Sequence, residues 1–255
     1  MAAIIPGLIL VFLYGLYFVL SLKKEVLTLD ENQKHENFFE LISTLIPPFF
    51  LIFAVLGSII TGIASPTEAA GIGALGAIFI ALIHKKLNFK ILKESTTQSA
   101  FISSMVFLIL IGASIFSLVF RGLGGEELIT EIFNATPGGL FGSMLLVMLL
   151  VFVLGFILDF IEITFIVVPI VGPILMAMGA DPLWLGVMLA INLQTSFLTP
   201  PFGFALFYLR SVTPETISTE SMYKGVFPFI LIQILVLCLV AYFPFLATLL
   251  PELIF

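Results

Sequence analysis

The feature that most restricts the fold of this chain is a series of long apolar stretches separated by short polar breaks. Of its 255 residues, 60% are hydrophobic and 10% are charged. Soluble domains are about 45–50% apolar and about 25% charged, and a helix needs about 20 apolar residues to cross a bilayer. The sequence therefore predicts an all-α integral membrane protein with several membrane-crossing helices. The apolar stretches are Ala2–Leu22, Leu41–Ile63, Ala69–Ile83, Ala100–Phe120, Gly139–Ile157, Ile163–Met178, Pro182–Asn192 and Val226–Leu250.

Lysine residues indicate how one pair of these stretches is oriented. Seven of the ten basic residues flank segment 41–83, namely Lys23, Lys24, Lys34, Lys85, Lys86, Lys90 and Lys93. Because Lys and Arg mark the cytoplasmic side of a membrane protein, we expect both ends of this segment to be cytoplasmic. A re-entrant helical hairpin fits better than two complete spans, because the centre of the segment is polar and contains helix breakers.

The expected organisation is a single membrane domain over residues 1–255. It consists of a first span and cytoplasmic linker (1–40), the re-entrant hairpin (41–84), core helices (98–212) that include a discontinuous helix (182–210), and a last span (224–250). Between the core helices, segment 121–134 is expected to be an external amphipathic or loop segment.

The first polar break lies at the centre of the hairpin. Ser65, Pro66 and Glu68 have the spacing of a capping box, in which the serine hydroxyl and the glutamate carboxylate satisfy the first amides of a new helix. We expect this helix to begin at mid-membrane depth, where its amino terminus is partly positive and the unwound backbone at 62–64 offers carbonyl oxygens. The alternative is an ordinary capped loop at the membrane surface.

The second break contains two consecutive prolines, Pro200 and Pro201. Proline disfavours helix in the residue before it, so we expect one half-helix to stop near Leu198 and another to start with Thr199 as its N-cap. Unpaired carbonyls at membrane depth are costly unless something replaces water, and a dehydrated sodium ion does so. Broken helices of this kind mark substrate and ion sites in secondary transporters. The alternative is a proline kink satisfied by neighbouring hydroxyl groups.

Two carboxylates lie within an otherwise apolar region. Asp159 and Glu162 are three residues apart, which predicts that they share one helix face. Carboxylates inside a membrane by default suggest function, so the pair is a candidate proton or cation relay. A solvated turn or a structural pair is the alternative, because the predicted topology places both residues near the cytoplasm.

Four polar residues end the first half-helix of the second break, and we expect them to hydrogen-bond a substrate. They are Asn192, Gln194, Thr195 and Ser196. Packing of polar groups in the protein core is the alternative. The single tryptophan, Trp184, is expected to anchor the chain at the membrane interface.

Several function classes are disfavoured by the sequence. The net charge of −6 and the scattered basic residues argue against nucleic-acid binding. The two histidines have no neighbouring ligand types, so no metal site beyond sodium and no cofactor is expected. An intramembrane enzyme using Asp159 and Glu162 has no supporting catalytic cluster. A membrane scaffold or degenerate fragment without transport activity stays open as an alternative.

Both breaks resemble those of a known family. Segments 62–70 and 194–210, together with the acidic segment 154–170, resemble the large membrane subunit of TRAP transporters, the tripartite ATP-independent periplasmic systems. The order of segments agrees along essentially the whole chain. The family's large subunit carries a further amino-terminal repeat that has no counterpart here, so the chain resembles its carboxyl-terminal half.

This resemblance implies one half of an inverted-repeat, elevator-type transporter in the bacterial inner membrane. Sodium would drive uptake of a small organic acid. The implied partners are the missing amino-terminal half, a small four-helix membrane subunit and a periplasmic solute-binding protein. Carried onto this chain, the hairpin tip and the proline break would together hold one sodium ion through Gly62, Ala64, Ser65, Thr67, Thr199, Pro200 and Gly203.

Overall fold

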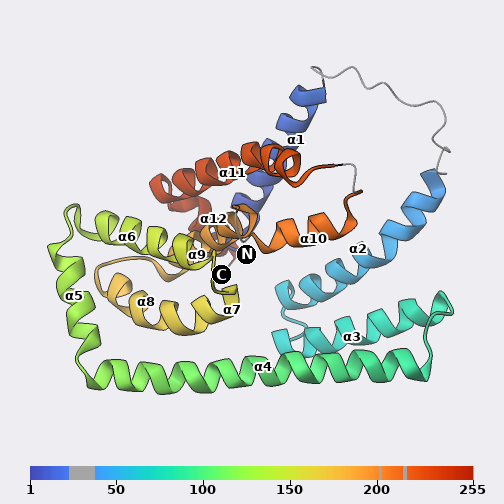
Figure 1. Cartoon of the computed structure of the whole chain (residues 1–255), viewed down its shortest axis with the longest axis horizontal. Helices are drawn as coiled ribbons and strands as arrows, with labels where there is room; N and C mark the ends of the chain where they lie inside the picture. Colours follow the sequence, from blue (N-terminus) through green and yellow to red (C-terminus); the bar gives the residue numbers. More distant parts are fainter. Residues whose placement is uncertain (23–37, 201–202, 215–216, 255) are drawn as a thin grey trace. The chain divides into compact units, whose positions relative to one another are not determined.

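The computed structural model describes residues 1–22, 38–200, 203–214 and 217–254, and every regular element within them is a helix (Figure 1). Five of these helices are long and apolar enough to cross a membrane. They contain Ile4–Ser21, Pro66–Ile83, Phe89–Gly122, Phe160–Ala177 and Thr219–Tyr242. The predicted all-α, polytopic membrane fold is therefore confirmed.

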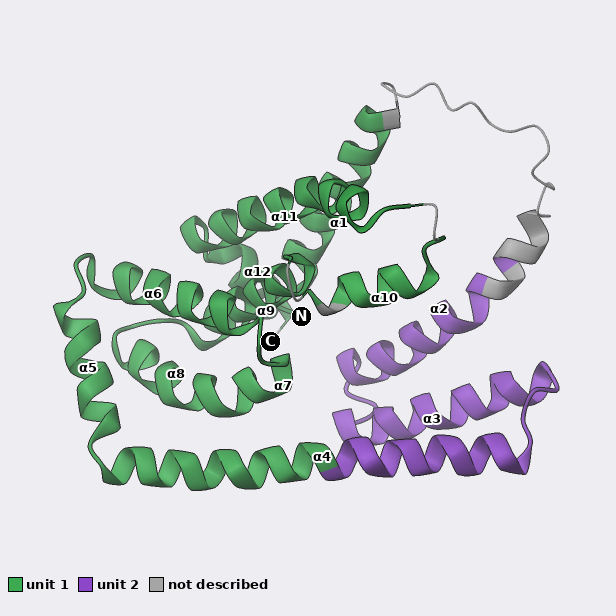
Figure 2. Ribbon diagram, in the orientation of Figure 1, with its two compact units in different colours: residues 1–25, 105–255 green, residues 26–104 purple. Residues whose placement is uncertain are grey.

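The chain divides into two compact units (Figure 2). Unit 1 comprises Met1–Glu25 and Met105–Phe255, and unit 2 comprises Val26–Ser104. Helix α4 (Phe89–Gly122) contributes its first part to unit 2 and its second part to unit 1. The predicted cytoplasmic linker after the first span falls largely on residues 23–37, which lie outside the described residues.

Unit 2 is built on a helical hairpin. Helix α2 (Phe38–Ile60) packs against α3 (Pro66–Ile83). The two helices approach closely where α3 has glycine: a Cβ atom on Gly73 would lie 3.2 Å from Val55 Cγ2, and one on Gly76 would overlap Leu51 Cδ1. Small residues allow such close packing of helices in membranes. A hairpin of two packed helices is present, and its re-entrant character and the mid-membrane depth of its tip stay predictions.

Replacing Gly76 with valine should destabilise the hairpin, because the new side chain would overlap Leu51 Cδ1 and force the Leu51 side chain out of its place between α2 and α3. Overpacking of this kind costs about 1–3 kcal/mol. The matched control is Gly71→Val, since a Cβ atom at Gly71 meets nothing within 4 Å. Thermal unfolding of the purified variants should show a lower Tm for Gly76→Val only. Equal Tm values for the two variants would show that the hairpin arms do not require glycine at this contact.

Helix α4 begins earlier than the apolar pattern predicts. The predicted span starts at Ala100, whereas the helix starts at Phe89 because Asn88 caps it, with the Ile91 amide donating to Asn88 Oδ1 at 2.8 Å. The polar residues before Ala100 are good enough helix formers to extend the span. At its end, α5 (Gly125–Ala135) forms the expected amphipathic segment, and Arg121 pairs with Glu126 at 2.7 Å.

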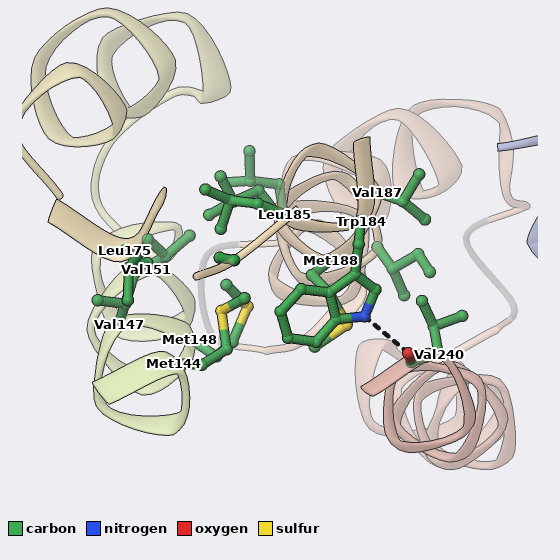
Figure 3. Packing of buried hydrophobic residues seen from close by; sticks show 14 of the residues in the cluster. Met144, Val147, Met148, Val151, Leu175, Trp184, Leu185, Val187, Met188 and Val240 are labelled. Atoms are coloured by element: carbon green, nitrogen blue, oxygen red, sulfur yellow. Dashed lines mark hydrogen bonds between the residues drawn. The ribbon is translucent and has the colours of Figure 1, made fainter. Parts of the chain in front are cut away.

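The core of unit 1 surrounds α9 (Pro182–Leu198), which packs against α6 (Gly139–Leu154) and against α11 (Thr219–Tyr242). Figure 3 shows methionine and valine side chains of α6 and α9 filling this core around Trp184. The Trp184 side chain is buried, and its Nε1 donates to the Val240 carbonyl at 2.8 Å. The prediction that Trp184 is an interface anchor is therefore wrong: the indole joins α9 to α11 inside the unit.

Helix α1 (Ile4–Leu22) of unit 1 agrees with the predicted first span. The predicted last span, 224–250, is wrong as a single helix. It is divided into α11 and α12 (Phe245–Ile254), because Pro244 disfavours a helical conformation at Phe243. Helix α12 packs against α1 and α9, so this break folds the end of the chain onto the unit 1 core.

Candidate functional site

The hairpin tip, residues 61–68, contains the predicted capping box. The Ser65 amide and hydroxyl both donate to Glu68 Oε2 at 2.8 Å, and the Glu68 amide donates to Ser65 Oγ at 3.4 Å. Pro66 occupies the first turn of α3, where a missing amide costs least. The serine and glutamate thus start α3 as the sequence predicts.

The backbone before this cap is unwound. Gly62 has a φ of 73°, a left-handed conformation that glycine tolerates best. The Ala64 amide donates to the Ser58 carbonyl at 3.1 Å, which folds the tip back on α2. Among the described residues, no hydrogen bond ends on the carbonyl oxygens of Gly62, Ile63 or Ala64. The tip therefore presents carbonyl oxygens beside the exposed side chain of Thr67, which is the ligand type that a hard cation prefers.

The second break is also present, with one correction. Helix α9 ends at Leu198 as predicted, and α10 spans Phe204–Val212. Thr199 is not the N-cap of the second half-helix: it is the C-cap of α9, and its Oγ1 donates to the Thr195 carbonyl at 2.8 Å. The reason is that Thr199 precedes Pro200, and Pro200 itself precedes Pro201, so neither residue favours helix. Gly203 caps α10 instead, and the intervening Pro201 and Phe202 lie outside the described residues.

The hairpin tip belongs to unit 2 and the proline break belongs to unit 1. The expectation that both breaks hold one sodium ion stays a prediction.

Three of the four predicted substrate residues face the core of unit 1. Asn192 is 2% exposed, and its Nδ2 donates to the Met148 carbonyl at 2.7 Å. The hydroxyls of Thr195 and Ser196 donate to carbonyls of their own helix, those of Ile191 and Leu193. These contacts are the ones expected of core polar packing. Substrate binding by all four residues stays a prediction, and the geometry favours it only for Gln194.

Gln194 is exposed on the opposite side of α9, where it lines a groove of about 580 Å³. The other wall comes from α7 (Phe160–Glu162) and the adjoining π-helix η1 (Ile163–Val167), which continues into α8 (Val168–Ala177). The groove is largely apolar, with Thr164 as a second polar side chain, and its lining is Phe160, Thr164, Val168, Gly186, Leu189, Ala190, Leu193, Gln194 and Phe197. Such a site suits a small ligand held by few polar groups.

The two carboxylates near this groove do not share a face of one helix as predicted. Asp159 is the N-cap of α7, and its Oδ1 accepts from the Phe160 amide at 2.7 Å. Glu162 lies in the first turn. The cause is the turn after α6, which places Asp159 in extended backbone with a ψ of 157°. Asp159 therefore acts as a helix cap, and a relay role for the pair stays a prediction.

Comparison with known proteins identifies the kind of protein that carries these breaks. Residues 1–246 match the family described as "Tripartite ATP-independent periplasmic transporter, DctM component". The chain belongs to this family. It is 29% identical over 263 residues to the sialic acid TRAP transporter large permease protein SiaM of Vibrio cholerae, which covers 99% of the chain and 59% of SiaM. The ectoine TRAP transporter large permease protein TeaC of Halomonas elongata is 26% identical over 256 residues, covering 100% of the chain and 59% of TeaC.

Another relative, the uncharacterized protein YgiK of Salmonella typhimurium, is 28% identical over 254 residues, covering 99% of the chain and 58% of YgiK. The chain thus spans about three fifths of the length of these relatives. The chain is therefore a membrane component of the DctM type, related to transporter permeases. The relatives' names give different substrates, so membership of the DctM family leaves the substrate open.

The π-helix and the groove were missed by the analysis of the sequence of this DctM-type chain. A π-helix inserts one extra residue into a turn and often occurs at functional sites. The π-helix, which contains Thr164, was not predictable from apolar periodicity, because Thr164 is the one polar side chain of stretch 163–178. Pro169, which cannot donate to the carbonyl four residues before it, was the one local signal of an irregular helix.

Proposed function

We propose that this chain is part of the large permease subunit of a sodium-coupled TRAP-type transporter that imports a small organic acid. Membership of the DctM family supports transport. The observation that carries the sodium coupling is the hairpin tip, where three successive carbonyl oxygens accept no hydrogen bond among the described residues. In a low-dielectric environment such groups need a partner, and a sodium ion supplies it.

The proposed sodium ligands at the tip are the carbonyl oxygens of Gly62 and Ala64 together with the hydroxyls of Ser65 and Thr67. At the proline break, Thr199, Pro200 and Gly203 are the proposed contributors. Sodium binding would give these carbonyl oxygens, which otherwise accept no hydrogen bond, a coordination partner. The free energy gained in this way would couple sodium binding to closure of the permease around its substrate.

The proposed substrate site is the groove beside α9, with the Gln194 amide and the Thr164 hydroxyl as hydrogen-bonding groups. An amide and a hydroxyl suit the carboxylate and hydroxyl oxygens of an organic acid, and the apolar walls suit its carbon chain. A periplasmic binding protein would deliver the acid, a small four-helix membrane subunit would support the permease, and an elevator-type movement in the bacterial inner membrane would complete transport.

The proposal is tested by uptake into proteoliposomes that contain the assembled permease, with its binding protein outside. Radiolabelled sialic acid, succinate, ectoine and isethionate form the substrate panel. For the substrate that is carried, we expect an inward sodium gradient to raise the initial rate at least tenfold over a potassium gradient. Uptake of equal rate under both gradients contradicts sodium coupling, and a proton gradient serves as the comparison.

Two substitutions at Ser65 distinguish a role in sodium binding from a role in helix capping. Replacing Ser65 with alanine should raise the sodium concentration needed for half-maximal uptake at least tenfold, because an oxygen ligand is lost. Ser65→Thr retains a hydroxyl and a cap, so it should behave nearly as the wild type. Thr199→Ala should reduce sodium dependence similarly.

Removal of the Ser65 cap alone costs about 1 kcal/mol of stability. A Ser65→Ala variant with a lower Tm but an unchanged sodium requirement would therefore identify Ser65 as a helix cap only. Unchanged sodium dependence in both Ser65→Ala and Thr199→Ala would remove the assignment of the sodium site to these two breaks.

A further inference from the structure

The turn between α3 and α4 carries a lysine in a conformation that lysine disfavours. Lys85 has a φ of 54° and is the only residue other than glycine with positive φ among those described. It occupies the C′ position of a Schellman motif, in which the Lys85 amide donates to Leu82 and the Lys86 amide donates to Ala81. Glycine is the usual residue at C′, because a side chain disfavours this left-handed backbone. The turn nevertheless carries the positive side chain of Lys85.

Two more lysines follow on the first turns of α4. Lys90 and Lys93 line a shallow groove of about 370 Å³ together with Thr97 and Gln98. Glu94 is the only carboxylate among the described residues that line this groove. Its Oε1 lies 3.9 Å from Lys90 Nζ, and the side chains of Glu94 and Lys90 are 63% and 84% exposed. Such an exposed ion pair at this distance is weak, so the ammonium groups of both lysines remain available to bind an anionic ligand.

The length of α4 places these lysines outside the hydrocarbon core of a bilayer. Its 34 residues extend for about 50 Å at 1.5 Å per residue, whereas the hydrocarbon core is about 30 Å thick. The part of α4 from Ala100 to Phe120 has no charged residue and is long enough to cross the hydrocarbon, so the turns that carry Lys90 and Lys93 project beyond it. Phe89 is 82% exposed at the same end of the helix.

We propose that Lys85, Lys86, Lys90 and Lys93 form a binding site for the headgroup of an anionic phospholipid. Four positive charges within nine residues, offset by one exposed carboxylate, are complementary to a lipid phosphate. Thr97 and Gln98 add neutral hydrogen-bonding groups. The site shares no residue with the proposed substrate and sodium sites, so it can be tested separately from them.

The test is native mass spectrometry of the purified full chain in neutral detergent with palmitoyl-oleoyl phosphatidylglycerol or phosphatidylcholine as the probe. We expect phosphatidylglycerol to be retained preferentially by the wild type. The charge-removing variant K85Q/K86Q/K90Q/K93Q should lose this preference by at least tenfold, since each lysine near an anionic surface contributes about a fivefold factor. The charge-retaining variant K85R/K86R/K90R/K93R should keep it.

Lys224→Gln is the matched control, because Lys224 is an exposed lysine paired with Glu220 at 2.7 Å, away from this site in sequence. It should retain phosphatidylglycerol like the wild type. A loss in Lys224→Gln as large as that in the quadruple variant, or full retention by the quadruple variant, would overturn the proposal.

Lys85→Gly is a second variant, and we expect it to fold normally because glycine tolerates a positive φ. Glycine relieves the positive φ, so the Tm in lipid-free neutral detergent should rise, whereas retention of phosphatidylglycerol should fall severalfold. A rise in Tm with unchanged lipid retention would exclude Lys85 from the site and would overturn its proposed role.

Discussion

Replacing Gly155 with alanine should destabilise unit 1 by about 1–3 kcal/mol. A Cβ atom on Gly155 would overlap Ser196 Oγ and lie 2.7 Å from Ser196 Cβ and 3.2 Å from the Val151 carbonyl. Its backbone is ordinary, with a φ of −64°, so the close approach alone requires glycine. Ser196 is fully buried and fixed by its bond to Leu193, so it cannot move aside and α6 must separate from α9.

Thermal unfolding followed by circular dichroism measures this effect. The matched control is Gly225→Ala in α11, where the new Cβ meets nothing within 4 Å. Because alanine favours helix over glycine by about 1 kcal/mol, the control should be neutral or more stable, so the two alanine variants should change Tm in opposite directions. A Gly155→Ala variant as stable as the wild type would show that α6 and α9 do not depend on this contact.

Filling the groove beside α9 should abolish most uptake. Ala190 is exposed and lines the groove, so an indole at this position would occupy space that the proposed substrate needs without disturbing the buried core. We expect Ala190→Trp to lower the initial rate of organic-acid uptake at least tenfold in the proteoliposome assay, with little change in Tm.

Ala177→Trp is the control for this variant, because Ala177 is an exposed alanine of α8 that does not line the groove. It should transport at close to the wild-type rate. Normal uptake by Ala190→Trp would place the substrate elsewhere while leaving the sodium proposal intact, since the hairpin tip is changed in neither variant.

Local backbone chemistry made the two breaks predictable. The spacing of Ser65, Pro66 and Glu68 fixed the start of α3, and the bonds of the capping box match it atom by atom. Two successive prolines fixed the end of α9 at Leu198. These signals act between residues that are at most a few positions apart and do not depend on how the helices pack, so the sequence alone was sufficient to predict them.

Long-range packing was not predictable in the same way. Asn192 and Gln194 are two residues apart and carry the same amide group, yet Asn192 is buried against the Met148 carbonyl and Gln194 faces the groove. Which face of α9 meets α6 depends on apolar packing, and the apolar residues of α9 are spread around the helix, so the sequence does not show which face is buried. The start of α4 at Phe89 was missed for a related reason, because hydropathy locates the hydrocarbon and not the end of a helix.

The hydrogen bond from Trp184 to the Val240 carbonyl makes this chain its own optical probe. The sequence contains one tryptophan, so intrinsic fluorescence at long excitation wavelengths comes from a single indole at the contact of α9 and α11. Its emission should be blue-shifted while the contact holds and should move to the red when water reaches the ring. Ligand- or ion-linked movement of α9 is therefore measurable in real time without labelling.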